Sequence, residues 1–161
     1  TKQEISQGIR DYQTIGGGVP SPSDCWLLNR SLSTFFLRME KHSANAIKLA
    51  DFLSSHPKIE KVYYPGLNTH PNHDIAKKQM KNGFGGMMSI LTKGNEQDCL
   101  NIASKLKIFQ HATSLGGVES LVDHRKSAEG LHSVSPENLL RISVGIENID
   151  DLLEDFSQAL G

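Results

Sequence analysis

The stretch from Leu139 to Gly145, LLRISVG, has the strongest strand pattern in the chain. Branched apolar residues surround a single arginine and a glycine ends the run, which is typical of a buried strand. Because side chains alternate between the two faces of a strand, we expect Leu139, Arg141 and Ser143 to share one face. Arg141 then needs a partner, since burying an unpaired guanidinium costs too much free energy.

The sequence leaves the partner of Arg141 open. The planar fork of a guanidinium matches a carboxylate through two parallel hydrogen bonds. That carboxylate could belong to an internal acid such as Glu119 or Glu147, or it could belong to a bound ligand.

Helix and strand patterns alternate along the rest of the chain. Residues 1–13 are helix-compatible and are followed by a glycine turn. Apolar residues at steps of three and four predict helices over 21–55, 73–81, 95–107 and 148–160. Further strands are expected over 61–64, 85–92 and 119–122, with an extended segment over 108–112. Helices against a small sheet of about four strands form an α+β layered domain, which is the fold class that we expect.

The composition is that of an ordinary globular chain. It has 161 residues, a net charge of −1 and 37% hydrophobic residues. The nearly neutral charge argues against a nucleic-acid partner. No apolar run approaches the roughly 20 residues that span a bilayer, so we expect no membrane segment.

The two cysteines, Cys25 and Cys99, are too few for a disulfide framework. This favours a reducing compartment, and we expect a cytoplasmic protein. Cys25 lies among apolar helical residues and is expected to be packed rather than reactive. Because the chain starts with Thr1 rather than Met, we expect a fragment of a longer protein.

Metal and phosphate sites are poorly supported. His70 and His73 have HxxH spacing beside Asp74, but zinc needs three or four ligands, so we expect no metal site. Gly16–Gly18 lacks the Gly-Lys-Ser/Thr that completes a phosphate-binding loop.

The segment from Thr113 to Ser120, TSLGGVES, has two interpretations. A serine beside two glycines leaves main-chain N–H groups open to a carboxylate or phosphate oxygen. A structural turn between two strands explains the same residues, and taken alone the segment favours the turn.

Seven motifs follow one another along nearly the whole chain. They are PSPSDCWL (20–27), NRSLST (29–34), RMEKH (38–42), VYYPGL (62–67), SLGGVESL (114–121), LLRISVGIE (139–147) and DLLED (151–155). In this order they resemble the Cys/Met-metabolism enzymes that use pyridoxal phosphate (PLP), a family that includes cystathionine γ-lyase and cystathionine γ-synthase.

The resemblance implies a fold-type I PLP enzyme, usually a homodimer or homotetramer. A large domain binds the cofactor, and a small C-terminal α+β domain, with helices on a mostly antiparallel sheet, closes the active site. Residues 1–30 then form the end of the large-domain segment and the linking helix, and residues 31–161 form the C-terminal domain. The Schiff-base lysine belongs to a Ser-Ala-Thr-Lys motif that this sequence lacks. We therefore expect no catalytic or cofactor-binding residue in this chain.

The resemblance also implies roles for four residues. Arg141 matches the arginine that binds the substrate α-carboxylate. Ser114 and Leu115 match the Ser-Leu-Gly turn that helps to hold the substrate. Thr113 matches a substrate-facing position that varies with the reaction.

Two segments depart from the family pattern. Ser31 and Ser33 stand where glycine and a basic residue are usual. Residues 123–130, DHRKSAEG, replace a segment at the active-site entrance that usually begins with His-Pro. These departures leave the choice among γ-lyase, γ-synthase, β-lyase and methionine γ-lyase open.

The expected function is C–S bond cleavage or γ-replacement on a sulfur amino acid such as L-cystathionine, by the full-length protein with PLP. This chain is expected to bind the substrate carboxylate, to close the site, and to be inactive alone. The alternative is a non-catalytic oligomerisation or regulatory module derived from the same family, which the departures at Ser31, Ser33 and 123–130 motivate.

Overall fold

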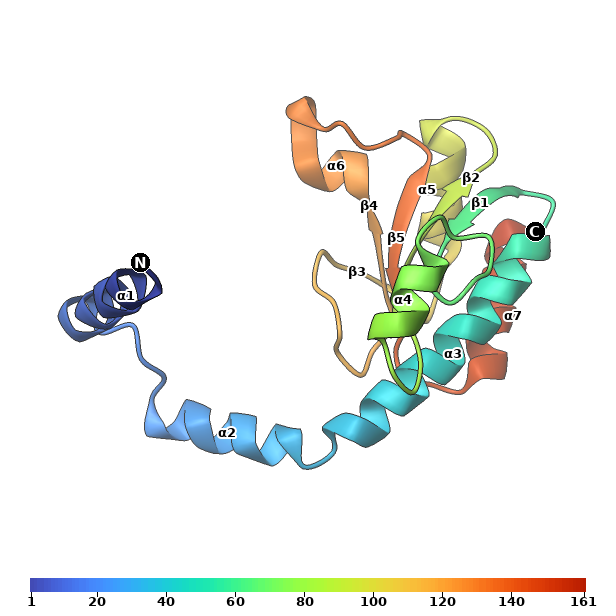
Figure 1. Ribbon diagram of the computed structural model, residues 1–161. Coiled ribbons are helices and arrows are strands. Elements are labelled where there is room, and N and C mark those ends of the chain that lie inside the picture. Colours follow the sequence, from blue (N-terminus) through green and yellow to red (C-terminus); the bar gives the residue numbers. More distant parts are fainter. The chain divides into compact units, whose positions relative to one another are not determined.

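The computed structural model describes residues 1–161 (Figure 1). They form two compact units, Thr1–Phe36 and Leu37–Gly161. Helix α3 (Phe35–Ser55) begins at the end of the first unit and supplies the first element of the second.

The first unit contains helices α1 (Lys2–Gly16) and α2 (Pro22–Leu32). Both begin with a capping box, in which the side chains of Thr1 and Ser21 accept main-chain hydrogen bonds. Gly17 ends α1 with a φ of 66°, a left-handed conformation that glycine adopts without steric cost. Neither helix buries a residue.

Two expectations for this part of the chain are wrong. The helix expected over 21–55 is interrupted at Ser33 and Thr34, between α2 and α3. There the N–H of Ser33 bonds to the carbonyl of Arg30 at 3.3 Å, which closes a tighter turn than the α-helix has. The apolar spacing continues across this break and therefore did not reveal it. Cys25 is exposed rather than packed, because α2 buries none of its residues.

The second unit is an α+β domain, as expected, with one five-stranded sheet in the order β1-β2-β5-β4-β3. Neighbouring strands are antiparallel except β3 and β4. The strands are β1 (Ile59–Tyr63), β2 (Met87–Thr92), β3 (Gln110–His111), β4 (Leu121–His124) and β5 (Leu139–Ser143). The other helices are α4 (His73–Gln79), α5 (Glu96–Lys105), α6 (Arg125–Glu129), the 3-10 helix η1 (Gly130–His132) and α7 (Ile149–Leu160).

One face of the sheet forms the hydrophobic core. Ile90 on β2 lies opposite Leu140 on β5, and Met88 lies opposite Ile142. All four are buried in one cluster with apolar residues of α3, α5 and α7. Alternation therefore turns Ser89 and Arg141, the residues between them, to the other face.

Polar side chains of α3 hold the chain directly after β5. Nδ1 of the buried His42 lies 2.6 Å from the carbonyl oxygen of Val144. The amide of Asn45 donates to the carbonyls of Gly145 (3.0 Å) and Glu147 (2.9 Å). Residues 144–147 are thus fixed against the long helix, and the loop described below is bonded to them. No helix of the chain combines the length and the apolar character needed to span a membrane.

Candidate functional site

The candidate site lies on the face of the sheet opposite the core, around Arg141. Arg141 is the cross-strand partner of both Ser89 on β2 and Asp123 on β4. Its neighbours on β5, Leu140 and Ile142, are completely buried, whereas the Arg141 side chain keeps 20% of its surface exposed. The face predicted from strand alternation is confirmed.

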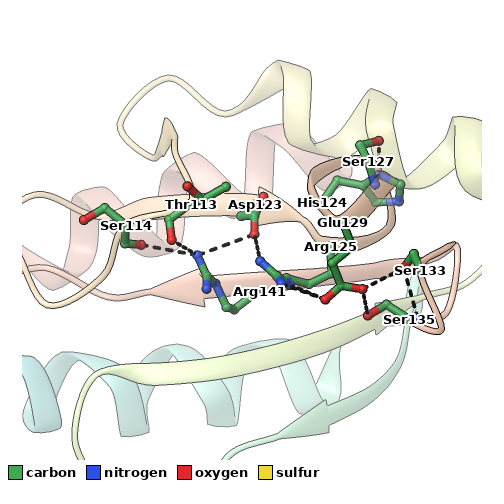
Figure 2. Close-up of polar contacts among 10 residues, drawn as sticks. All are labelled: Thr113, Ser114, Asp123, His124, Arg125, Ser127, Glu129, Ser133, Ser135 and Arg141. Carbon is green, nitrogen blue, oxygen red and sulfur yellow. Dashed lines mark hydrogen bonds and ion pairs between the residues drawn. The ribbon is translucent and has the colours of Figure 1, made fainter. Parts of the chain in front are cut away.

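Figure 2 shows the partners of Arg141. Its Nη2 donates to the carbonyls of Thr113 and Ser114, the second at 3.4 Å, and lies 3.4 Å from Oδ2 of Asp123. Nε and Nη1 have no hydrogen-bond partner within the chain. Two of the three guanidinium nitrogens thus remain for a ligand, and a carboxylate is the group that their planar geometry fits.

Asp123 is the internal acid nearest to Arg141, and the sequence had not singled it out as a possible partner. Neither Glu119 nor Glu147, the two acids that the sequence offered as examples, contacts the guanidinium. The strand expected over 119–122 ends two residues before β4 does and so leaves out Asp123, which lies directly opposite Arg141 on β4.

The loop that carries Thr113, Ser114 and Leu115 is exposed at all three residues. Its main chain meets Arg141 through carbonyl oxygens rather than through N–H groups. The N–H of Gly116, where φ is +75°, donates to Oγ of Ser143 at 2.9 Å. Ser143 follows Arg141 on the same face of β5. The loop is therefore bonded to this strand at two points, through Arg141 and through Ser143.

The far end of the loop is fixed by Ser120 and Glu147. The Glu147 carboxylate accepts the N–H of Ser120 at 2.6 Å and the hydroxyl of Ser120 at 2.8 Å. That hydroxyl oxygen in turn accepts the N–H of Gly145 at 2.8 Å. A Cβ on Gly145 would lie 2.4 Å from the carbonyl oxygen of Val118, so no larger residue fits there. The position of the loop is therefore set by residues 143–147.

A second arginine continues the polar network away from Arg141 (Figure 2). Arg125, the first residue of α6, donates from Nη1 to Oδ2 of Asp123 at 2.7 Å. Its Nε and Nη2 both donate to Oε1 of Glu129, at 3.2 and 2.6 Å. The hydrogen bonds to Asp123 and then to Glu129 raise the pKa of Arg125 above its ordinary value.

Glu129 closes this network at the end of α6. Its Oε2 accepts the hydroxyls of Ser133 (2.7 Å) and Ser135 (2.8 Å). These two hydroxyls, and then Arg125, lower the pKa of Glu129 to about 2. The carboxylate therefore ties the segment that follows α6 back onto the helix over most of the pH range.

His124 and Ser127 form the start of α6. Nε2 of His124 lies 2.8 Å from the carbonyl oxygen of Glu137, which assigns the ring proton to Nε2. Nδ1 then accepts the hydroxyl of Ser127 at 2.6 Å and its N–H at 3.4 Å. The pair caps the helix, and α6 was not expected from the sequence because five residues show no apolar periodicity.

No group of three or more His, Cys, Asp or Glu residues is arranged to hold a metal ion. Nδ1 of His73 lies 2.8 Å from the carbonyl oxygen of Pro65, and Nδ1 of His70 accepts the N–H of Asn72 at 3.2 Å. The HxxH pair thus stabilises its own loop.

The residues around Arg141 do not by themselves fit PLP. None of its contacts is a lysine that could form a Schiff base, and the amine of Lys126 on α6 is paired with Glu96 at 2.7 Å and Glu137 at 3.4 Å. The site can bind and orient an anionic group, and no covalent step follows from it.

Comparisons with known proteins agree with this architecture. The family model described as "Cys/Met metabolism PLP-dependent enzyme" matches residues 1–161. Cystathionine gamma-synthase of Mycobacterium tuberculosis is 44% identical over 164 residues, which are 99% of this chain and 42% of that protein. Cystathionine gamma-lyase of Dictyostelium discoideum is 44% identical over 167 residues, which are 98% of this chain and 42% of that protein.

A solved structure extends the likeness to the fold. The crystal structure of metB from Corynebacterium glutamicum matches with a TM-score of 0.89 and 44% identity, over 98% of this chain and 42% of that one. The chain spans less than half the length of the relatives that it matches. With the family model matched from the first residue to the last, this chain belongs to the family of Cys/Met-metabolism PLP-dependent enzymes.

Proposed function

We propose that this chain is the C-terminal part of a PLP-dependent enzyme that cleaves or replaces a C–S bond in a sulfur amino acid such as L-cystathionine. Its relatives include a cystathionine gamma-synthase and a cystathionine gamma-lyase, and it covers 42% of each. In this proposal residues 1–30 end the cofactor-binding domain and form the linking helix, and residues 31–161 form the C-terminal domain. The full-length protein is a cytoplasmic homodimer or homotetramer.

The observation that carries the proposal is the state of Arg141. A guanidinium on a partly covered sheet face needs an anionic partner. The nearest carboxylate oxygen, Oδ2 of Asp123, lies 3.4 Å from Nη2 of Arg141. The same oxygen accepts a hydrogen bond from Arg125 at 2.7 Å. Two nitrogens of Arg141 are left for a bidentate carboxylate, and every amino acid substrate carries one at its Cα.

The role of the chain in this proposal is positioning. Arg141 binds the α-carboxylate, while Thr113, Ser114 and Leu115 contribute the exposed loop beside it. Clamping the carboxylate fixes where the reacting side chain of the substrate lies, and such orientation lowers the barrier of a later step. Pyridoxal phosphate, bound elsewhere in the full-length protein, supplies an electron sink for the chemistry. The isolated chain is therefore inactive.

Steady-state kinetics of the full-length protein with L-cystathionine test this function. We expect Arg141→Ala to lower kcat/KM by about 100-fold or more, and Arg141→Lys to recover only part of the loss because an ammonium lacks the fork. Arg10→Gln, at an exposed position on α1, is the matched control. A full-length protein without PLP-dependent turnover of sulfur amino acids would favour the non-catalytic module instead.

A further inference from the structure

Asp123 is a buried carboxylate between two arginines. Its side chain is 8% exposed, and the structure gives it no contact with a positive group other than Arg125 and Arg141. A buried carboxylate stays ionised only when a positive or hydrogen-bonding partner compensates for its lost hydration. The two arginines thus share one counter-ion.

The sharing is unequal. Nη1 of Arg125 lies 2.7 Å from Oδ2 of Asp123, within the range of a strong charge-assisted hydrogen bond. Nη2 of Arg141 lies 3.4 Å from the same oxygen and donates to the Thr113 carbonyl instead. Asp123 is therefore compensated mainly by Arg125, and Arg141 is held by neutral main-chain oxygens.

We propose that Arg125 sets the affinity of the site for its substrate, because it holds Asp123 and leaves Arg141 free for the substrate carboxylate. This inference rests on the proposed role of Arg141. When a carboxylate binds Arg141, Asp123 keeps Arg125 as its partner and no buried charge is stranded. Without Arg125, Asp123 would have Arg141 as its single counter-ion, and the substrate would have to compete with it.

The network around Arg125 supports this role. Its other nitrogens bond to Glu129, which Ser133 and Ser135 also hold, so the guanidinium is fixed from both sides (Figure 2). The charges of Arg141, Arg125, Asp123 and Glu129 sum to zero, so a carboxylate bound to Arg141 brings the group to −1. Asp123 then keeps a counter-ion only through its hydrogen bond to Arg125. Arg125 also lies in the segment 123–130, which departs from the family pattern. We therefore assign the pairing of Arg125 with Asp123 to this chain in particular.

The test is the KM and kcat of the full-length holoenzyme with L-cystathionine. We expect Arg125→Gln to raise KM about tenfold with a smaller change in kcat, because Asp123 then competes for Arg141. Removing the competing charge reverses the effect, so the double variant Arg125→Gln, Asp123→Asn should bind more tightly than Arg125→Gln alone. A general structural defect would lower kcat together with the affinity, whereas competition by Asp123 for Arg141 acts on KM. Arg125→Lys, which keeps the charge, should recover part of the affinity.

Lys126→Gln is the matched control, since it removes ion pairs of the same helix to Glu96 and Glu137 without touching Asp123. Its KM should stay at the wild-type value. An unchanged KM in Arg125→Gln, or a double variant that binds more weakly than Arg125→Gln, overturns the inference. Suppose that the wild type turns over L-cystathionine and Arg141→Ala is impaired. Either of these two results then refutes the role of Arg125 and leaves the proposed function standing. If the wild-type holoenzyme does not turn over a sulfur amino acid, the proposed function fails, and this inference fails with it.

Discussion

Replacing Glu147 by glutamine should loosen the loop that holds Arg141. The carboxylate accepts the N–H of Ser120 at 2.6 Å and its hydroxyl at 2.8 Å, and the hydroxyl oxygen holds the N–H of Gly145. Hydrogen bonds to a charged group contribute about 1.5–3 kcal/mol each. Glutamine keeps the shape and one acceptor oxygen, so about one such bond is lost. We expect the free energy of unfolding to fall by about 2 kcal/mol, roughly 4–8 °C in Tm for a chain of this size.

Urea unfolding of the 161-residue chain followed by circular dichroism measures this loss, with Glu154→Gln as the control. Glu154 lies on α7, seven residues after Glu147, and its side chain is exposed. In the full-length protein the same Glu147→Gln change should raise KM for L-cystathionine, because the carbonyls of Thr113 and Ser114 no longer hold Arg141 in place. An unfolding free energy within about 0.5 kcal/mol of the wild type would refute the bracing role of Glu147.

Three further predictions concern other buried or paired groups. Asp155→Ala should lower the free energy of unfolding, measured in urea, by about 3 kcal/mol or more. The buried carboxylate of Asp155 accepts hydrogen bonds from the N–H groups of residues 107–109, which would lose their partner. Glu129 has a pKa lowered from 4.5 to about 2, so its stabilising effect is complete above pH 4.5 and disappears as the pH falls through 2. The difference in unfolding free energy between the wild type and Glu129→Gln should shrink over that interval, and a difference independent of pH would contradict the network at α6. Burial raises the pKa of Tyr64 from 10.0 to about 12, so the wild type should lose stability relative to Tyr64→Phe as the pH rises from 10 to 12. Equal alkaline denaturation curves for the two proteins would refute that prediction.

The sequence predicted the elements whose patterns are local and strong. The apolar run around Arg141 fixes both the strand β5 and the face on which the guanidinium lies, because the period of a strand is two residues. Asn148 caps α7 as expected, since a side-chain acceptor before an apolar stripe is a sufficient signal for a helix start.

The rest depended on contacts between distant segments. Strand β3 has only two residues, and it exists because its pairing with β4 supplies the hydrogen bonds. Asp123 became the partner of Arg141 through the register of β4 with β5, which sequence spacing does not determine. Arg125 is positioned by a helix of five residues that has no apolar stripe of its own. The Cys/Met-metabolism resemblance implied the role that we propose for Arg141, whereas the network of Asp123, Arg125 and Glu129 behind it needed the structure.

If Arg141 binds a substrate carboxylate, ligands with and without that group must differ in affinity, and paired inhibition constants measure the difference. L-Methionine and 3-(methylthio)propylamine differ only in the α-carboxylate, and both are assayed against L-cystathionine turnover by the full-length protein. We expect the wild type to bind L-methionine about 10- to 100-fold more tightly than the amine, and this preference to fall to about threefold or less in Arg141→Ala. A preference for L-methionine that is unchanged in Arg141→Ala would show that another group binds the carboxylate.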